Sequence, residues 1–155
     1  MIYCTAASED DIFEILRIER EAISPPWTHG ALLGEIYRED AFFAAARCDD
    51  VTNASRVVGF VILQRMGDDG ELLQIAVDTA SRRLGVADLL MTAMLCYAER
   101  KGLTSVFLEA RKGNIAAISL CTKHGFTEVR TRKDYYSGPV EDAIVMAREL
   151  KGMVI

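Results

Sequence analysis

The sequence predicts a mixed α+β fold, in which a central, mostly antiparallel sheet of six to seven strands carries about four helices on its two faces. Apolar runs of strand length recur along the whole chain, and segments with apolar residues at helical spacing stand between them. The elements follow the order strand, two helices, three strands, helix, strand, helix and two strands. This alternation is typical of a sheet that is covered on both faces.

The first third of the chain predicts a strand followed by two helices. Residues 2–6 form the strand. Ser8 stands three residues before Asp11, which is the pattern of a capping box at a helix start, and this helix extends to about Arg20. Consecutive prolines then interrupt the pattern, and Thr28 is placed to cap a second helix.

The middle of the chain predicts three antiparallel strands in a meander. Residues 41–47, 57–65 and 71–77 are mainly apolar runs of strand length. The polar stretch 49–55 links the first two strands, and the Gly-Asp-Asp-Gly turn at 67–70 links the next two.

The last third predicts alternating helices and strands. Apolar residues recur at helical spacing over 88–101, and strand 105–110 follows. The segment 114–123 begins with an asparagine cap and precedes a glycine, as helices commonly do. Residues 127–133 and 142–147 supply two closing strands.

Composition and charge limit the classes of protein to which this chain can belong. A chain of 155 residues, with 50% apolar and 26% charged residues, is typical of one globular domain, here expected over residues 1–155. The sequence lacks a basic leader and any run near the roughly 18 apolar residues of a membrane span. We therefore expect a cytoplasmic protein without a membrane partner. A net charge of −5 argues against a nucleic-acid partner, which would require clustered basic residues.

The cysteines predict neither a metal site nor a disulfide framework. Cys4, Cys48, Cys96 and Cys121 lie at least 25 residues apart, and the chain has only two histidines. Because their surroundings are mostly apolar, Cys4 and Cys96 are expected to be buried small hydrophobic residues.

The strongest local motif lies between the strand at 71–77 and the following helix. Gly85 and Ala87 minimise side-chain bulk where that helix begins, so backbone N–H groups can receive a pyrophosphate. Arg82 and Arg83 add positive charge at the same place. Taken alone, the motif also fits a tight helix start with solvated arginines.

In its context, this segment matches the Arg-x-x-Gly-x-Ala form of the acetyl-CoA loop and resembles that of the GNAT superfamily. Further motifs resemble, in order, those of the ribosomal-protein alanine N-acetyltransferases, the RimI-like branch. They are Pro-Trp-Thr at 26–28, Leu-Glu-Ala-Arg at 108–111, Asn-Ile-Ala-Ala-Ile at 114–118, Lys-His-Gly-Phe at 123–126, Arg-Lys-Asp-Tyr-Tyr at 132–136 and Glu-Asp-Ala-Ile-Val-Met at 141–146. The resemblance covers about residues 10–148.

The resemblance implies an acetyl-CoA-dependent N-acetyltransferase that transfers acetyl directly to an amine within a ternary complex. The expected acceptor is the N-terminal α-amine of a protein, such as a ribosomal protein. The implied partners are acetyl-CoA and this protein or peptide, and the expected state is a monomer or weak homodimer. A small-molecule amine acetyltransferase and a non-catalytic acetyl-CoA-binding regulatory module are the alternatives.

The resemblance also implies which residues bind acetyl-CoA. The main chain of Ile75, Ala76 and Val77 would hold the pantetheine and the thioester carbonyl. The pyrophosphate cradle would comprise Arg82, Arg83, Leu84, Gly85, Val86, Ala87 and Asp88, with the Asp88 carboxylate pointing away from the phosphates. Asn114 is implied as a cofactor contact, although an ordinary helix cap explains it as well. Lys123 completes this set.

For catalysis, the resemblance implies Glu109 as the general base, whereas a salt bridge with Arg111 or a nearby lysine is its structural alternative. Cys121 stands where the family has a tyrosine as general acid. Three possibilities remain open for the acid step. Cys121 or a water donates the proton, a tyrosine such as Tyr135 or Tyr136 reaches in, or the enzyme is slow or inactive.

Three aromatic residues are candidates for binding the acceptor. Tyr135 and Tyr136 resemble the substrate-side pair of the branch, although ordinary packing at a strand end explains them equally well. Trp27 is a candidate wall of a peptide groove, or an anchor over the core.

Overall fold

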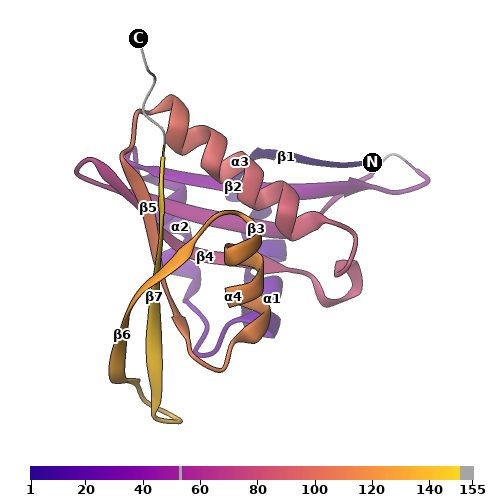
Figure 1. Ribbon diagram of the computed structural model, residues 1–155. Coiled ribbons are helices and arrows are strands. Elements are labelled where there is room, and N and C mark those ends of the chain that lie inside the picture. Colours follow the sequence, from indigo (N-terminus) through magenta and orange to yellow (C-terminus); the bar gives the residue numbers. More distant parts are fainter. Residues whose placement is uncertain (53, 151–155) are drawn as a thin grey trace. The chain divides into compact units, whose positions relative to one another are not determined.

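The structure, a computed structural model, describes residues 1–52 and 54–150 (Figure 1). Its strands are β1 (Ile2–Ala6), β2 (Ala41–Asp49), β3 (Ser55–Met66), β4 (Asp69–Val77), β5 (Ser105–Arg111), β6 (Thr127–Tyr136) and β7 (Glu141–Glu149). Its α-helices are α1 (Ile12–Ala22), α2 (His29–Tyr37), α3 (Val86–Arg100) and α4 (Ile115–Lys123), with short 3₁₀ turns η1 (Glu9–Asp11) and η2 (Thr79–Ser81).

The strands form a sheet in the order β1-β2-β3-β4-β5-β7-β6. The β1/β2, β2/β3, β5/β7 and β6/β7 pairs are antiparallel, whereas β4 and β5 are parallel. The predicted fold class, a mixed fold with a mostly antiparallel sheet, is therefore confirmed.

The chain divides into two compact units. Unit 1 comprises residues 1–64 and 73–97, and unit 2 comprises residues 65–72 and those from 98 onward. Strand β4 contributes residues to both units, since its first part belongs to unit 2 and its second part to unit 1. A single domain over residues 1–155 remains a prediction.

In unit 1, the first helix begins later than the sequence predicts. The Ser8 backbone N–H donates to the Asp11 carboxylate at 2.9 Å, so the predicted capping box is present. It opens the 3₁₀ turn η1, and α1 begins only at Ile12. The Asp11 carboxylate forms an ion pair with Arg47 of β2, whose Nη2 lies 2.6 Å away, so this ion pair connects the helix start to the sheet.

Unit 1 packs helices against both faces of its strands (Figure 1). Phe43 on β2 belongs to the apolar cluster that includes Ile15 of α1. The adjacent Phe42 points to the opposite face, where its ring stacks on Tyr97 of α3 with centroids 4.6 Å apart. Because successive strand residues face opposite sides, one strand contacts both helical layers.

Helix α3 begins two residues earlier than predicted, at Val86. Gly85 has a φ of +79°, a conformation that glycine adopts readily, and turns the chain into the helix. Gly59 of β3 allows a close approach, since a Cβ there would lie 2.8 Å from the Ala76 carbonyl oxygen and 3.1 Å from Val86. The early start follows from this packing, which the local sequence does not reveal.

The surface of α3 corrects one prediction about cysteines. Leu95 and Ala98 of α3 are buried, whereas Cys96 is exposed and Cys4 on β1 is half-buried. The expectation of burial is therefore wrong for Cys96, because helical spacing turns it away from the core. None of the helices in the part of the chain that the structure describes is long and apolar enough to cross a membrane.

In unit 2, β7 lies between β5 and β6. Glu109 pairs with Val145 on β7, and Val145 pairs in turn with Arg130 on β6. Strand β6 continues to Tyr136, three residues beyond the prediction, and contains both tyrosines. Because directly paired residues share a face of a sheet, Glu109, Val145 and Arg130 lie in one row across the three strands.

Candidate active site

In unit 1, the loop that the sequence predicts to bind acetyl-CoA follows a firmly anchored strand end. Asp78, directly after β4, is buried and accepts hydrogen bonds from Arg17 at 3.3 Å and Arg56 at 3.4 Å. Its backbone N–H donates to the Val58 carbonyl at 2.8 Å. The end of β4 is thus held by α1 and β3, and η2 leads from there into the loop.

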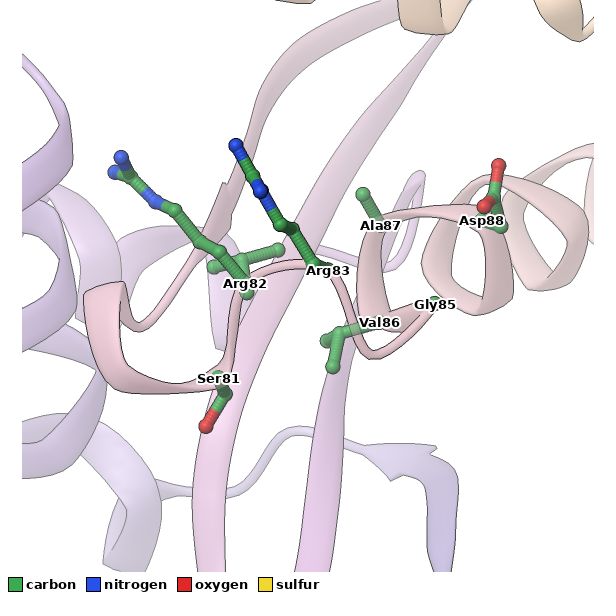
Figure 2. Close-up of a pocket in the computed structure, with 8 residues that line it drawn as sticks. Ser81, Arg82, Arg83, Gly85, Val86, Ala87 and Asp88 are labelled. Atoms are coloured by element: carbon green, nitrogen blue, oxygen red, sulfur yellow. The ribbon is translucent and has the colours of Figure 1, made fainter.

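Figure 2 shows the loop from Ser81 to Asp88. The side chains of Arg82 and Arg83 are exposed and extend to the same side of the backbone. Arg83 has a φ of +65°, so left-handed residues stand at positions 83 and 85. The loop borders a shallow hollow of about 150 Å³ at the N-terminus of α3.

This arrangement fits an anionic group such as a pyrophosphate. The first N–H groups of an α-helix have no partner within the helix, and the helix dipole places partial positive charge there. Left-handed residues turn backbone N–H groups into concave anion sites, and the two guanidinium groups add full charges. Leu84 is exposed, while Asp88 lines the hollow at the opposite end of the loop from Arg82 in Figure 2.

The strand that leads to the loop combines packing with accessible backbone. Ala76 is buried, whereas Ile75 and Val77 are half-buried, and Val77 borders the hollow. Both sequence-based interpretations, core packing by side chains and cofactor binding by main chain, remain compatible with these positions.

In unit 2, the Glu109 carboxylate is partly exposed on β5. Its Oε1 lies 3.2 Å from Nε of Arg132 on β6, and its side chain is 21% exposed. A hydrogen bond from the Tyr135 hydroxyl to Glu109 raises the pKa of Tyr135. The ion pair observed for Glu109 therefore involves Arg132, where the sequence suggested Arg111 or a lysine.

Arg111 contacts a different carboxylate. Its Nη1 lies 3.3 Å from Oε1 of Glu141 on β7, and its guanidinium lies 4.5 Å from the centre of the Tyr136 ring. Tyr136 and Tyr135 pack edge to face with centroids 5.1 Å apart. The structure thus brings Glu109 and the tyrosine pair together within unit 2.

Glu71 is a carboxylate that the sequence did not single out. It pairs with Phe107 in the parallel β4/β5 ladder, so its side chain lies on the same face as Glu109, two residues further along β5. Burial and the charge of Glu109 raise the pKa of the Glu71 carboxyl. The sequence places Glu71 at the start of the strand predicted at 71–77, but only the register places it beside Glu109.

Cys121 belongs to the buried part of α4. The residue is 3% exposed, and burial raises the pKa of its thiol to about 11. The thiol is therefore protonated at neutral pH, but the core surrounds it. This position favours a water or a tyrosine as the acid over Cys121 itself.

The remaining predicted residues have identifiable local contacts. Asn114 caps α4, since its Oδ1 accepts the N–H of Ala117 at 3.2 Å. Lys123 is exposed on the last turn of α4. In unit 1, Trp27 is half-buried against the apolar core, and its backbone N–H donates to Glu19 at 2.7 Å.

A mixed sheet, with a glycine-containing loop that leads from a central strand into the N-terminus of the next helix, fits the class of acyltransferases that use coenzyme A thioesters. The model of the acetyltransferase (GNAT) family matches residues 10–126. The chain belongs to this family and is an N-acetyltransferase, with acetyl-CoA as the donor that the family uses.

Relatives in this family agree with the resemblance. The chain is 31% identical to the ribosomal protein bS18-alanine N-acetyltransferase of Haemophilus ducreyi, covering 90% of this chain and 94% of the relative. It is 30% identical to an N-alpha-acetyltransferase of Sulfurisphaera tokodaii, covering 90% and 88%. The crystal structure of the ribosomal-protein-S18-alanine N-acetyltransferase from Escherichia coli superposes with a TM-score of 0.86 at 27% identity, covering 100% of this chain and 99% of that one.

Proposed function

We propose that this N-acetyltransferase acetylates the N-terminal α-amine of a protein, and that a ribosomal protein beginning with alanine is the first acceptor to test. The similarity to enzymes named for bS18 alanine and for N-alpha acetylation, over 90% of the chain, supports this choice. The net charge of −5 is compatible with a cationic acceptor, since an α-amine is protonated below about pH 8.

The observation that supports catalysis most directly is the Glu109 cluster of unit 2. A protonated amine must lose a proton before its nitrogen can attack a thioester. Glu109 offers a partly exposed carboxylate, whose orientation is maintained by Arg132 at 3.2 Å. We assign to it the role of general base, acting directly or through a water.

The donor requires a different set of residues. The Arg82–Asp88 loop binds the pyrophosphate, and the main chain of Ile75–Val77 holds the pantetheine and the thioester carbonyl. The amine nitrogen forms a bond to the acetyl carbon, the carbon–sulfur bond breaks, and the departing thiolate of coenzyme A takes up a proton.

The proton for this thiolate comes from Tyr135 or from water in our proposal. Tyr135 is 50% exposed and shares a hydrogen bond with Glu109, whereas the Cys121 thiol is enclosed by the core. The raised pKa keeps the Tyr135 hydroxyl protonated at neutral pH, so it has a proton to donate. A cytoplasmic location, a monomer or weak homodimer, and a reaction without metal remain predictions.

The test is a turnover assay with acetyl-CoA, a panel of N-terminal peptides and a panel of small amines, following both release of the coenzyme A thiol and acceptor mass. We expect acetylation of an alanine α-amine, with kcat reduced about 10²- to 10⁴-fold by Glu109→Gln. Glu149→Gln, an exposed carboxylate on β7, is the matched control and should leave kcat unchanged.

The other outcomes separate the alternatives. Acetylation of small amines but of no peptide would contradict the proposed acceptor. Binding of acetyl-CoA without turnover of any acceptor would favour a regulatory binding module.

A further inference from the structure

Glu19 of α1 is a fully buried acidic residue that the proposed reaction does not use. Its side chain is 0% exposed and lies at the core of unit 1, where its helix neighbours Ile15 and Ile18 are also fully buried. Its Oε1 accepts two hydrogen bonds, from the Trp27 backbone N–H at 2.7 Å and from Nε2 of Gln74 at 2.9 Å.

Two oxygen atoms of this cluster lack a hydrogen-bond donor in the part of the chain that the structure describes. They are Oε2 of Glu19 and Oε1 of Gln74, both buried. An unpaired buried oxygen is costly, and an ionised carboxylate without a cation is more costly still. Both groups that donate hydrogen bonds to Glu19, the Trp27 backbone N–H and the Gln74 amide, are neutral.

A single proton resolves both deficits. A proton on Oε2 of Glu19 gives this atom a hydrogen that can be donated to Oε1 of Gln74. The carboxylic acid and the carboxamide then exchange two hydrogen bonds, and neither oxygen is left unpaired. Burial acts in the same direction, because it raises the pKa of the Glu19 carboxyl.

We propose that Glu19 is a neutral carboxylic acid at physiological pH and acts as a positioning residue. Its hydrogen bond from the Trp27 N–H holds the loop at 23–28 to helix α1, and its paired hydrogen bonds with Gln74 hold strand β4 to the same helix. The loop at 23–28 follows α1 directly, and Gln74 precedes Ile75 on β4. This position lets Glu19 hold both the loop of Trp27, a candidate wall of the peptide groove, and the strand proposed to hold the thioester.

The protonation state is tested directly by infrared spectroscopy. The difference between the spectra of the wild-type protein and Glu19→Gln, recorded at neutral pH with ¹³C-labelled glutamate, should contain the carbonyl band of a protonated carboxyl group. Carboxylate bands in its place would overturn the proposal. This measurement needs no substrate, so it is independent of the proposed function.

The positioning role rests on the proposed function and is tested by kinetics. Glu19→Gln preserves the acceptor for Trp27 and offers an amide N–H to Gln74, so both KM values and kcat should stay within about twofold of wild type. Glu19→Leu retains the bulk of the side chain but removes every hydrogen bond that it makes. It should raise KM for the peptide about tenfold or more, because small displacements of binding groups have large effects. KM for acetyl-CoA should change less.

Arg20→Gln, an exposed neighbour on α1, is the matched control and should change none of these constants. A Glu19→Gln variant as impaired as Glu19→Leu would refute a neutral Glu19, and an unchanged peptide KM in a folded Glu19→Leu would refute positioning. Should Glu19→Leu fail to fold, Gln74→Met tests the same hydrogen bonds with the same expected rise in peptide KM. Absence of peptide turnover in the wild-type protein would instead contradict the proposed function, and the infrared result would still decide the state of Glu19.

Discussion

At the scale of single residues, Cys121 stands where the family has a tyrosine as general acid, so another group is needed for that step in the proposed reaction. A tyrosine side chain extends well beyond its helix, whereas the thiol of Cys121 remains within the core at 3% exposure. The sequence shows this replacement, but it does not show that another hydroxyl stands next to Glu109, the proposed base. The hydrogen bond between Tyr135 and Glu109 makes Tyr135 the proposed alternative.

Removing this hydroxyl should therefore impair the chemical step. We expect Tyr135→Phe to lower kcat about 10- to 100-fold, while KM for acetyl-CoA stays nearly constant, because the ring and its packing on Tyr136 are retained. Steady-state kinetics with an alanine peptide measures both constants. An unchanged kcat in Tyr135→Phe would assign the acid step to water.

Cys121→Ala provides the complementary test. Because the thiol is buried on α4, its removal should lower the free energy of unfolding by about 1–2 kcal/mol and leave kcat of the folded enzyme within about twofold. Denaturant unfolding and kinetics on the same sample separate the two effects. A loss of kcat far beyond the loss of stability would restore Cys121 as an acid.

At the scale of secondary-structure elements, much of the architecture follows from local patterns. The Thr28 cap at the start of α2 is observed, since its hydroxyl accepts the Ala31 N–H at 3.1 Å. Element ends are less accurate because tertiary contacts decide them. The contact of Gly59 with Val86 explains the early start of α3, and pairing of Tyr136 with Glu141 on β7 explains the extended β6.

The candidate site is predictable only in part for the same reason. The loop at 82–88 has a local sequence signature that can be recognised without a structure, and its role in cofactor binding stays a prediction. The partners of Glu109 depend on strand register, since Arg132 and Glu71 are distant in sequence and are aligned by β6, β7 and β4. One sequence without the register does not reveal these neighbours.

The loop conformation itself can be tested at Gly85. We expect Gly85→Ala to cost about 1 kcal/mol of stability, because φ at this position is +79°. The substitution should also raise KM for acetyl-CoA several-fold, because it displaces the N–H groups around the hollow. Gly102→Ala is matched in strain, with φ of +70° at the end of α3, and should lose stability without a change in KM. Equal KM values for both variants would contradict a cofactor role for the loop.

At the scale of the whole molecule, the division into two units raises the question of cooperativity. Residues of β4 and of α3 belong to both units, so neither unit can unfold without breaking the hydrogen bonds of an element that continues into the other. We expect a single thermal transition, with equal calorimetric and van't Hoff enthalpies. Two separated transitions, or a protease-resistant fragment of one unit, would contradict the single-domain prediction.

The pH dependence of stability should be governed in acid by the ion pair between the sheet and the start of α1. Burial alone would raise the pKa of the Asp11 carboxyl, but hydrogen bonds from Arg47 and Ser8 and the charge of Arg47 lower it overall. A lowered folded-state pKa stabilises the protein above the unfolded-state value of about 3.9. This stabilisation disappears as pH falls through the folded-state pKa.

Arg47→Met should therefore destabilise the protein by about 2–3 kcal/mol at pH 7, because it leaves the Asp11 carboxylate buried without its cation. The deficit should shrink as the pH falls and Asp11 becomes protonated, and should reach its minimum below the folded-state pKa of Asp11. Arg38→Met is the matched control, since Arg38 and Asp40 form an exposed pair at 2.8 Å that should contribute at most about 1 kcal/mol. Urea unfolding of both variants from pH 7 to pH 2.5 measures the difference. A deficit for Arg47→Met that stays constant with pH would show that another contact of the guanidinium, such as the hydrogen bond from Nε to the Thr5 hydroxyl at 2.7 Å, stabilises the fold in place of its charge on Asp11.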